Sequence, residues 1–132
     1  MNEPVWIDER DVLVLHDRLL ALHGGAEGVR DQGLLQSALG RPLNIFHYED
    51  EAGVIRLATA YTAGIVRNHP FVDGNKRTGF VTGILFLELN GFRFTASEVE
   101  ATRAVLEMAA GTMDEAAYEA FLRANSRSSA EK

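Results

Sequence analysis

The segment from residue 74 to residue 90 constrains the fold of this chain most, because it is predicted to be a helix with apolar side chains on nearly every side. A helix there begins near Gly74 or Asn75 and runs to Asn90, and Gly91 follows as a common helix stop. Its large apolar residues are Phe80, Val81, Ile84, Leu85, Phe86, Leu87 and Leu89. Since a helix that is hydrophobic all round is a buried one, we expect this segment to be the central helix of the domain.

Helical periodicity also dominates the part of the chain before this segment. Asp8 is expected to cap a first helix, and Asp31 is expected to begin a shorter one that ends at Gly40 and Pro42. The predicted buried face of the first helix carries Val12, Leu15, Leu19 and Leu22. A third helix is predicted over residues 51 to 67 from its apolar spacing.

Two capping boxes predict two more helices near the C-terminus. Ser97 is paired with Glu100, and Thr112 with Glu115, at the spacing that lets each pair satisfy free amides of a helix start. Residues 92 to 94 read FRF and are predicted to form a brief strand.

The segment from residue 42 to residue 50 has no helical period, so we expect it to be extended, as a hairpin or flap. It contains Ile45, Phe46, His47 and Tyr48. The predicted architecture is therefore an all-α, compact single domain of about six helices with a short extended flap. It spans residues 1 to 126, and residues 127 to 132 are expected to fray.

Composition excludes several classes of protein. The chain has 132 residues and no Cys, so disulfides, thiolate metal sites and cysteine catalysis are ruled out. Its formal net charge of -6 argues against direct nucleic-acid binding, which usually needs a basic face. The N-terminus lacks the basic and apolar blocks of a signal peptide, and no apolar run reaches the length of about 20 residues that a membrane helix needs. We expect a cytoplasmic protein with no membrane contact.

The loop that precedes the predicted central helix concentrates the reactive side chains of the chain. Residues 68 to 79 read NHPFVDGNKRTG. The first amides of a helix lack intrahelical partners and bind anions, and Gly74 lets the backbone approach a ligand closely. Lys76 and Arg77 place positive charge at the N-terminus of the predicted helix, which is already the positive end of its dipole. A bound polyphosphate would offset this unfavourable charge. Asn75 can hydrogen-bond phosphate oxygens, and Arg77 can do so with two parallel bonds.

Two further side chains of this loop indicate a reaction. A carboxylate beside a phosphate site, here Asp73, is a natural Mg²⁺ ligand. His69 carries an imidazole, which is suited to take a proton from a hydroxyl near neutral pH. A base, a metal carboxylate and an anion site together favour transfer of a phosphorus-containing group from a nucleotide to a hydroxyl. Arg67 is a weaker candidate for a phosphate contact.

Structural roles remain open for the same residues. Asp73 is a good N-cap, Lys76 and Arg77 can form a solvated first turn, and Arg67 can bind the last carbonyls of its own helix. A zinc enzyme is disfavoured, because His69 and Asp73 supply only two of the three protein ligands that catalytic zinc needs. Three other histidines are interpreted as turn or packing residues, namely His16, His23 and His47.

Residues 69 to 77 resemble the defining motif of the Fic/Doc superfamily, H-x-F-x-[D/E/N]-G/A-N-x-R. They stand here as His69-Pro70-Phe71-Val72-Asp73-Gly74-Asn75-Lys76-Arg77. GVRDQGLLQSALGRP at 28 to 42 and NGF at 90 to 92 resemble the death-on-curing (Doc) branch. The resemblance implies a Fic/Doc-type fold with His69 as general base and Asp73 as Mg²⁺ ligand. It implies that the phosphates of ATP are bound by Gly74, Asn75, Lys76 and Arg77, with Arg67 a weaker candidate.

The resemblance also implies an activity and partners. Proteins of the Doc branch have lysine where Lys76 stands, and they transfer the γ-phosphate of ATP to a threonine of translation elongation factor Tu. Doc proteins are toxins restrained by a Phd antitoxin, and no Ser or Thr here begins the internal inhibitory pattern [S/T]-x-x-x-E-[G/N]. The target-binding flap would then correspond to the segment of Ile45, Phe46, His47 and Tyr48.

Two alternatives stay open. Gly74 resembles the AMP-transferring Fic branch, although those enzymes carry glycine where Lys76 stands. A non-catalytic interaction partner, with the loop as a binding surface, is the alternative from another class.

Overall fold

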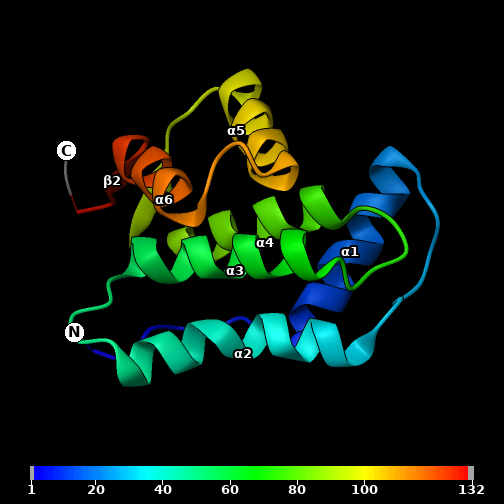
Figure 1. The fold of residues 1–132 in the computed structure, drawn as a ribbon. Helices are drawn as coiled ribbons and strands as arrows, with labels where there is room; N and C mark the ends of the chain where they lie inside the picture. The colour runs from blue at the N-terminus through cyan, green and yellow to red at the C-terminus, as the bar shows by residue number, and fades with distance from the viewer. Residues whose placement is uncertain (1, 131–132) are drawn as a thin grey trace.

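The computed structural model describes residues 2–130, which form a helical domain with one small sheet (Figure 1). The elements are α1 (Glu9–His23), α2 (Gln32–Tyr48), α3 (Val54–Asn68), α4 (Asn75–Leu89), β1 (Phe92–Phe94), α5 (Glu98–Ala110), α6 (Glu115–Ala124) and β2 (Ser126–Ser128). The expected all-α class and the number of helices are confirmed. No helix in the described part is long and apolar enough to span a membrane.

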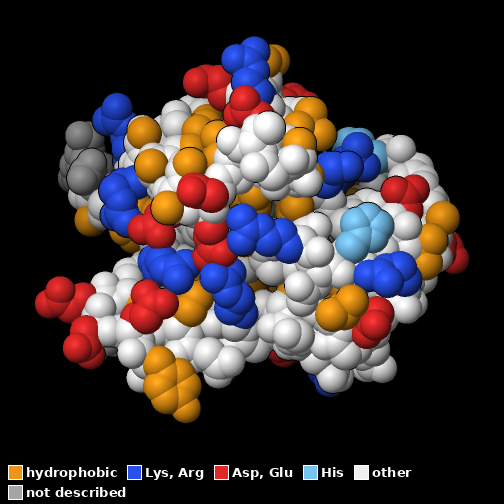
Figure 2. Space-filling model, in the orientation of Figure 1, with side chains coloured by type: hydrophobic (Ala, Val, Ile, Leu, Met, Phe, Trp, Pro, Cys, Tyr) orange, Lys and Arg blue, Asp and Glu red, His pale blue; other side chains and the backbone are white. Residues whose placement is uncertain are grey.

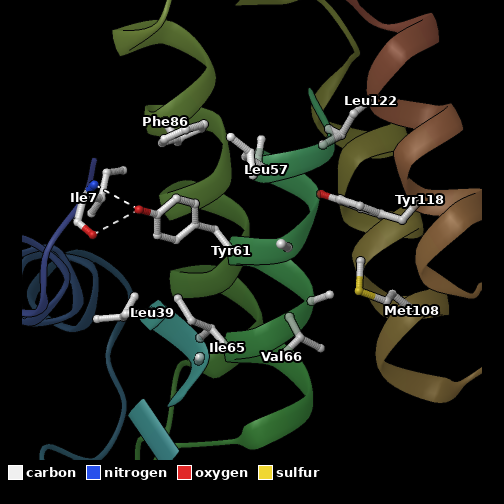
Figure 3. Close-up of a cluster of buried hydrophobic side chains, with 14 of the residues drawn as sticks. Ile7, Leu39, Leu57, Tyr61, Ile65, Val66, Phe86, Met108, Tyr118 and Leu122 are labelled. Carbon is white, nitrogen blue, oxygen red and sulfur yellow. Dashed lines mark hydrogen bonds between the residues drawn. The ribbon is translucent and has the colours of Figure 1, made fainter. Parts of the chain in front are cut away.

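Helix α3, rather than α4, is the surrounded helix of this domain. In Figure 1 it lies between α2 on one side and α5 and α6 on the other, with α4 beside it. Every residue from 57 to 66 is buried. The side chains that fill the core around it come from several of these helices, as Figure 3 shows for Leu39, Phe86, Met108, Tyr118 and Leu122. The prediction that residues 74 to 90 form the central helix is therefore wrong, although the bounds of that helix are close to those observed.

Small residues explain why the prediction failed. The face that α4 turns toward α3 includes Thr78, Gly79, Thr82 and Gly83, whereas Phe80, Ile84 and Leu85 are only half-buried and Leu89 is exposed. The hydroxyl of Thr62 on α3 donates to the carbonyl of Gly79 at 2.8 Å, which ties the two helices together. A count of large apolar residues identifies the helix with the most hydrophobic surface. How closely two helix backbones can pack depends instead on the small residues at their contact.

Helix α2 continues through Pro42 to Tyr48, so the predicted helix end and the predicted extended flap are both wrong. Leu35, Ala38, Leu39, Pro42 and Ile45 are buried, and they recur at helical spacing along one face. Proline costs a helix one backbone hydrogen bond. Burial of its ring on this continuous apolar face offsets that cost.

Helix starts follow the predictions more closely. Asp8 and Ser97 each form a complete capping box, and the side chain of Asp31 accepts from the amide of Leu34 at 2.9 Å. The predicted Thr112 box is wrong, because the N-cap of α6 is Asp114. The buried face of α1 also differs from the predicted one, and it carries Val12, His16 and Leu20 while Leu22 is 76% exposed.

Strand β1 confirms the strand predicted at 92–94, but its partner was not anticipated. It pairs antiparallel with β2, with Phe92 opposite Ser128 and Phe94 opposite Ser126. Residues 127 and 128, part of the segment expected to fray, are therefore held in a sheet, whereas residues 131–132 lie outside the described residues.

The N-terminal segment is anchored to the core through Tyr61 of α3 (Figure 3). The amide of Ile7 donates to the Tyr61 hydroxyl at 3.0 Å, and that hydroxyl donates to the Ile7 carbonyl at 3.2 Å. Burial raises the pKa of Tyr61 to about 12. The phenol therefore remains protonated at physiological pH and keeps both hydrogen bonds.

Candidate functional site

The site begins where α3 ends, at a histidine with an unusual backbone. His69 is the C-cap of α3 and adopts the left-handed conformation, with φ 53° and ψ 53°. This conformation costs a residue with a side chain about 1–2 kcal/mol. Arg30 holds it in place, since its Nε donates to the His69 carbonyl at 2.8 Å and its Nη2 donates to the Asn68 carbonyl at 3.0 Å. The imidazole of His69 is exposed.

The connection between α1 and α2, residues 24–31, lies antiparallel beside the loop that joins α3 to α4. The amide of Val72 donates to the Gly28 carbonyl at 3.0 Å, and the amides of Arg30 and Asp31 donate to the Pro70 carbonyl at 2.7 and 3.0 Å. This connection is the backbone that shapes the site from outside the motif. Apart from Asp31 as a helix start and the resemblance of residues 28 to 42 to the Doc branch, the sequence did not indicate that this connection lies beside the motif.

The inner side of the α3–α4 loop is locked by side chains. Phe71 is fully buried, and its ring stacks on His16 of α1 with centroids 3.8 Å apart. Asn75 is 4% exposed, and its carboxamide accepts from the amide of Phe71 and donates to the carbonyl of Phe71, both at 2.9 Å. The structure thus uses the side chain of Asn75, predicted to bind phosphate, to close the loop.

Asp73 lies at the surface of the loop with its carboxylate held by two backbone amides. Oδ2 accepts from Ala26 at 3.2 Å, and Oδ1 accepts from Gly74 at 2.8 Å. Hydrogen bonds from Ala26 and then Gly74 lower the pKa of Asp73 below its usual value, so the carboxylate is ionised at neutral pH. A Cβ on Gly25 would lie 2.8 Å from Oδ2, so only glycine at that position allows this approach.

Helix α4 starts without a side-chain cap and with positive charge in its first turn. Its N-cap is Gly74 in the left-handed conformation, with φ 79°, and no acidic residue lies in the first turn. Lys76 and Arg77 are exposed there. In Figure 2, His, Lys and Arg side chains gather on the part of the surface that lies over the α3–α4 loop.

The structure brings six of the predicted site residues together around one open hollow of about 210 Å³. Its lining consists of His69, Asp73, Gly74, Asn75, Lys76 and Arg77. A proton acceptor, a carboxylate and the amides of a helix start therefore face the same space, which is a suitable arrangement for an anionic substrate and a proton transfer.

Arg67 and the predicted flap lie elsewhere. Arg67 does not line the hollow, and its Nη1 donates to Oε1 of Glu115 at 3.2 Å. The segment 45–48 is the last turn of α2, at the opposite end of α3 from His69 (Figure 1). A helix of 15 residues such as α3 is about 22 Å long, so this segment is not a flap over the site.

Asp73 fits the role of a Mg²⁺ ligand only together with a phosphate-bearing ligand. Among residues 2–130 no three His, Cys, Asp or Glu side chains are grouped to hold a metal ion. Mg²⁺ commonly takes one or two carboxylates and completes its shell with phosphate oxygens and water. The single ionised carboxylate beside a helix start matches that chemistry.

Comparison with known proteins gave consistent matches. Residues 6–87 match the model of the Fic/DOC family. The chain is 32% identical over 85 residues to protein kinase Doc of Escherichia phage P1, an alignment that covers 64% of this chain and 68% of that protein. It is 35% identical over 92 residues to toxin Doc of Mycolicibacterium smegmatis, covering 69% of this chain and 68% of that protein.

Proposed function

This chain belongs to the Fic/DOC family, and from that premise we propose that it is a Doc-type toxin with kinase activity. In this proposal it binds ATP with Mg²⁺ and transfers the γ-phosphate to a threonine hydroxyl of elongation factor Tu, which arrests translation. The names of its two relatives, a protein kinase Doc and a toxin Doc, support the proposal.

One observation carries the proposal, namely the hollow at the start of α4. Its floor is a helix start with two basic residues, Lys76 and Arg77, and no acidic residue in the first turn. That combination destabilises the isolated helix and favours a bound polyanion. His69 lines the same hollow, so a hydroxyl brought to the bound phosphates lies within reach of a base.

The proposed reaction follows from these positions. His69 takes the proton from the attacking threonine hydroxyl while its oxygen forms a bond to the γ-phosphorus. The bond from that phosphorus to the β,γ-bridging oxygen breaks, and ADP leaves with the electron pair. Lys76, Arg77 and the first amides of α4 hold the phosphates, and Asp73 would hold a Mg²⁺ that offsets charge on them.

A second transfer is favoured by a specific residue. Gly74 matches the AMP-transferring branch at a position where Doc-like motifs often have alanine. A Cβ there would lie 3.5 Å from Leu20 and 3.6 Å from His16, on the buried side of the loop, so this alternative depends on the resemblance and not on space in the hollow. Lys76 argues against that alternative, since its side chain adds charge and bulk where AMP-transferring relatives have glycine.

We also propose that a Phd-like antitoxin covers a neighbouring hollow. This hollow of about 370 Å³ shares Lys76 and Arg77 with the site and is lined further by apolar residues such as Phe80, Val105 and Leu106. A partner segment with an apolar face and an acidic residue fits both parts of this lining. Such a segment would compete with nucleotide phosphates for the two cations.

The test is a paired labelling assay. The purified chain is incubated with Mg²⁺, elongation factor Tu and ATP labelled on either the α- or the γ-phosphorus. We expect transfer only from the γ position. His69→Ala should abolish transfer, while His47→Ala, which changes an exposed histidine at the far end of α2, should leave it unchanged.

Other outcomes would redirect the proposal. Transfer from the α position would establish an AMP transferase, and Lys76→Gly should then preserve or raise that activity. Transfer from neither position, together with no Mg²⁺-ATP binding by calorimetry, would leave the non-catalytic partner as the explanation.

A further inference from the structure

His16 of α1 is a buried polar residue that contacts the site from behind. It is 2% exposed, and its Nε2 lies 2.8 Å from the carbonyl oxygen of Asp73. Since a carbonyl oxygen only accepts, Nε2 must carry the hydrogen and donate it. The ring also stacks on Phe71, so its orientation is set independently of this hydrogen bond.

This hydrogen bond controls the direction of a neighbouring amide. In a planar trans peptide, the C=O and the following N–H point in opposite directions. Because His16 holds the Asp73 carbonyl on the inner side, the N–H of Gly74 points outward. There it meets the Asp73 carboxylate at 2.8 Å, at the rim of the hollow.

Glycine makes that orientation easy to lose. Gly74 has φ 79°, and glycine reaches many backbone conformations at little cost. Among the described contacts, the Asp73 carbonyl bonds only His16, so this donor holds the inner side of the peptide, while the bond from the Gly74 amide to the Asp73 carboxylate holds its outer side.

We propose that His16 is a positioning residue for the phosphate site, because it fixes the peptide between Asp73 and Gly74 so that the Gly74 amide points outward and holds the Asp73 carboxylate at the rim of the hollow. This inference rests on the proposed function, in which Asp73 and Gly74 meet the phosphates. His16 itself contacts no ligand. It acts from 57 positions away in the sequence, through one hydrogen bond.

Two variants separate the hydrogen bond from simple packing. His16→Gln keeps an N–H donor near the position of Nε2, and His16→Leu has a similar size without a donor. Both lose the aromatic stacking on Phe71, and His16→Leu also leaves the Asp73 carbonyl without its donor, so His16→Leu should be the less stable of the two. Thermal unfolding followed by circular dichroism measures both effects and shows that both variants fold.

Binding of Mg²⁺-ATP and of inorganic pyrophosphate is then measured by calorimetry on wild type and both variants. We expect His16→Leu to weaken binding about fivefold to tenfold, which is the upper part of the range for one net hydrogen bond, and His16→Gln to stay within about threefold of wild type. Equal losses in the two variants, or wild-type affinity in folded His16→Leu, would overturn the inference.

A second readout needs no nucleotide. In a metal-free ¹H–¹⁵N spectrum, hydrogen bonding to a carboxylate moves the Gly74 amide proton downfield. That shift should persist in His16→Gln and disappear in His16→Leu. If wild type binds neither ATP nor pyrophosphate but the shift follows the donor, the proposed function fails, and what stands is the control of the Asp73–Gly74 peptide by His16. If wild type binds ATP and the shift is the same in all three proteins, the positioning role fails alone.

Discussion

At the contact between α3 and α4, single glycines determine how closely the two backbones approach. A Cβ built on Gly83 would collide with Oγ1 of Thr62 and lie 3.0 Å from the carbonyl of Ala58. A Cβ on Gly79 would lie 3.0 Å from a methyl group of Val66. These neighbours belong to the rigid core helix, so they cannot move away at low cost.

Gly83→Ala should therefore destabilise the protein. Overpacking of a core contact costs about 1–3 kcal/mol, which exceeds the gain of up to about 1 kcal/mol from the better helix former. The matched control is Gly40→Ala in α2, where a Cβ meets nothing within 4 Å, so stability should be equal or higher. Urea unfolding of both variants measures the difference. Equal stability for the two variants would contradict this account of the α3–α4 contact.

The arrangement of three helices depends on one carboxylate at the start of α6. Glu115 accepts from Arg41 of α2 and Arg56 of α3 through Oε2, both at 2.7 Å, and from Arg67 of α3 through Oε1. Its side chain is 16% exposed. Burial by itself raises the pKa of Glu115, but hydrogen bonds from Arg41 and Arg56 outweigh it and leave the pKa below its usual value of 4.5.

Glu115→Gln should lower the free energy of unfolding at neutral pH by about 1–3 kcal/mol, since charged hydrogen bonds are lost in a half-buried place. Because the pKa of Glu115 is depressed in the folded state, its contribution is present above pH 4.5 and is lost as the pH falls through the folded value. The difference in the free energy of unfolding between wild type and Glu115→Gln should therefore shrink in acid, and urea unfolding at several pH values measures it. Glu119→Gln, on the next turn of α6, is the control and should cost under about 1 kcal/mol, since its Arg123 partner is 60% exposed and its other partner, Nε of Arg56, lies 3.9 Å away. If this difference in the free energy of unfolding does not change with pH, the charge of the Glu115 carboxylate does not stabilise the fold.

At the scale of the whole molecule, one core joins the N-terminal segment to the helices. Trp6, the single tryptophan, packs against Phe46 of α2 at 5.5 Å and Phe86 of α4 at 5.9 Å between ring centroids. Its fluorescence therefore reports whether the chain start is docked on two helices that are distant in sequence.

We expect the fluorescence of Trp6 and the helical circular dichroism signal to change in the same urea transition, because the residues around Trp6 belong to the same core as α3. Tyr61→Phe removes the hydroxyl that holds Ile7 and should uncouple the two signals, with fluorescence changing at lower urea. If the wild-type signals already separate, the N-terminal segment is an independent unit.

Features that depend on neighbours along the chain were predictable. The caps at Asp8, Asp31 and Ser97 and the grouping of six motif residues around a helix start arise from contacts within a few positions. A backbone amide and a side chain three residues away meet in any helix start, whatever the rest of the fold does. Reactive residues brought together by a loop and one helix turn are therefore visible in the sequence.

Features that depend on contacts between distant segments of the chain could not be predicted from the sequence. His16 on α1 and Arg30 in the α1–α2 connection both bind backbone carbonyls of the motif loop. Glu115 binds Arg67, which does not line the hollow. The apolar face that continues along α2 past Pro42 is buried because α2 packs on α3. Helix α3 is central because small residues at its contacts let the neighbouring helices pack close to its backbone. A count of large apolar residues in the sequence does not show how closely two helices can pack. Such contacts join groups far apart in the chain, and their geometry is set only when the helices pack.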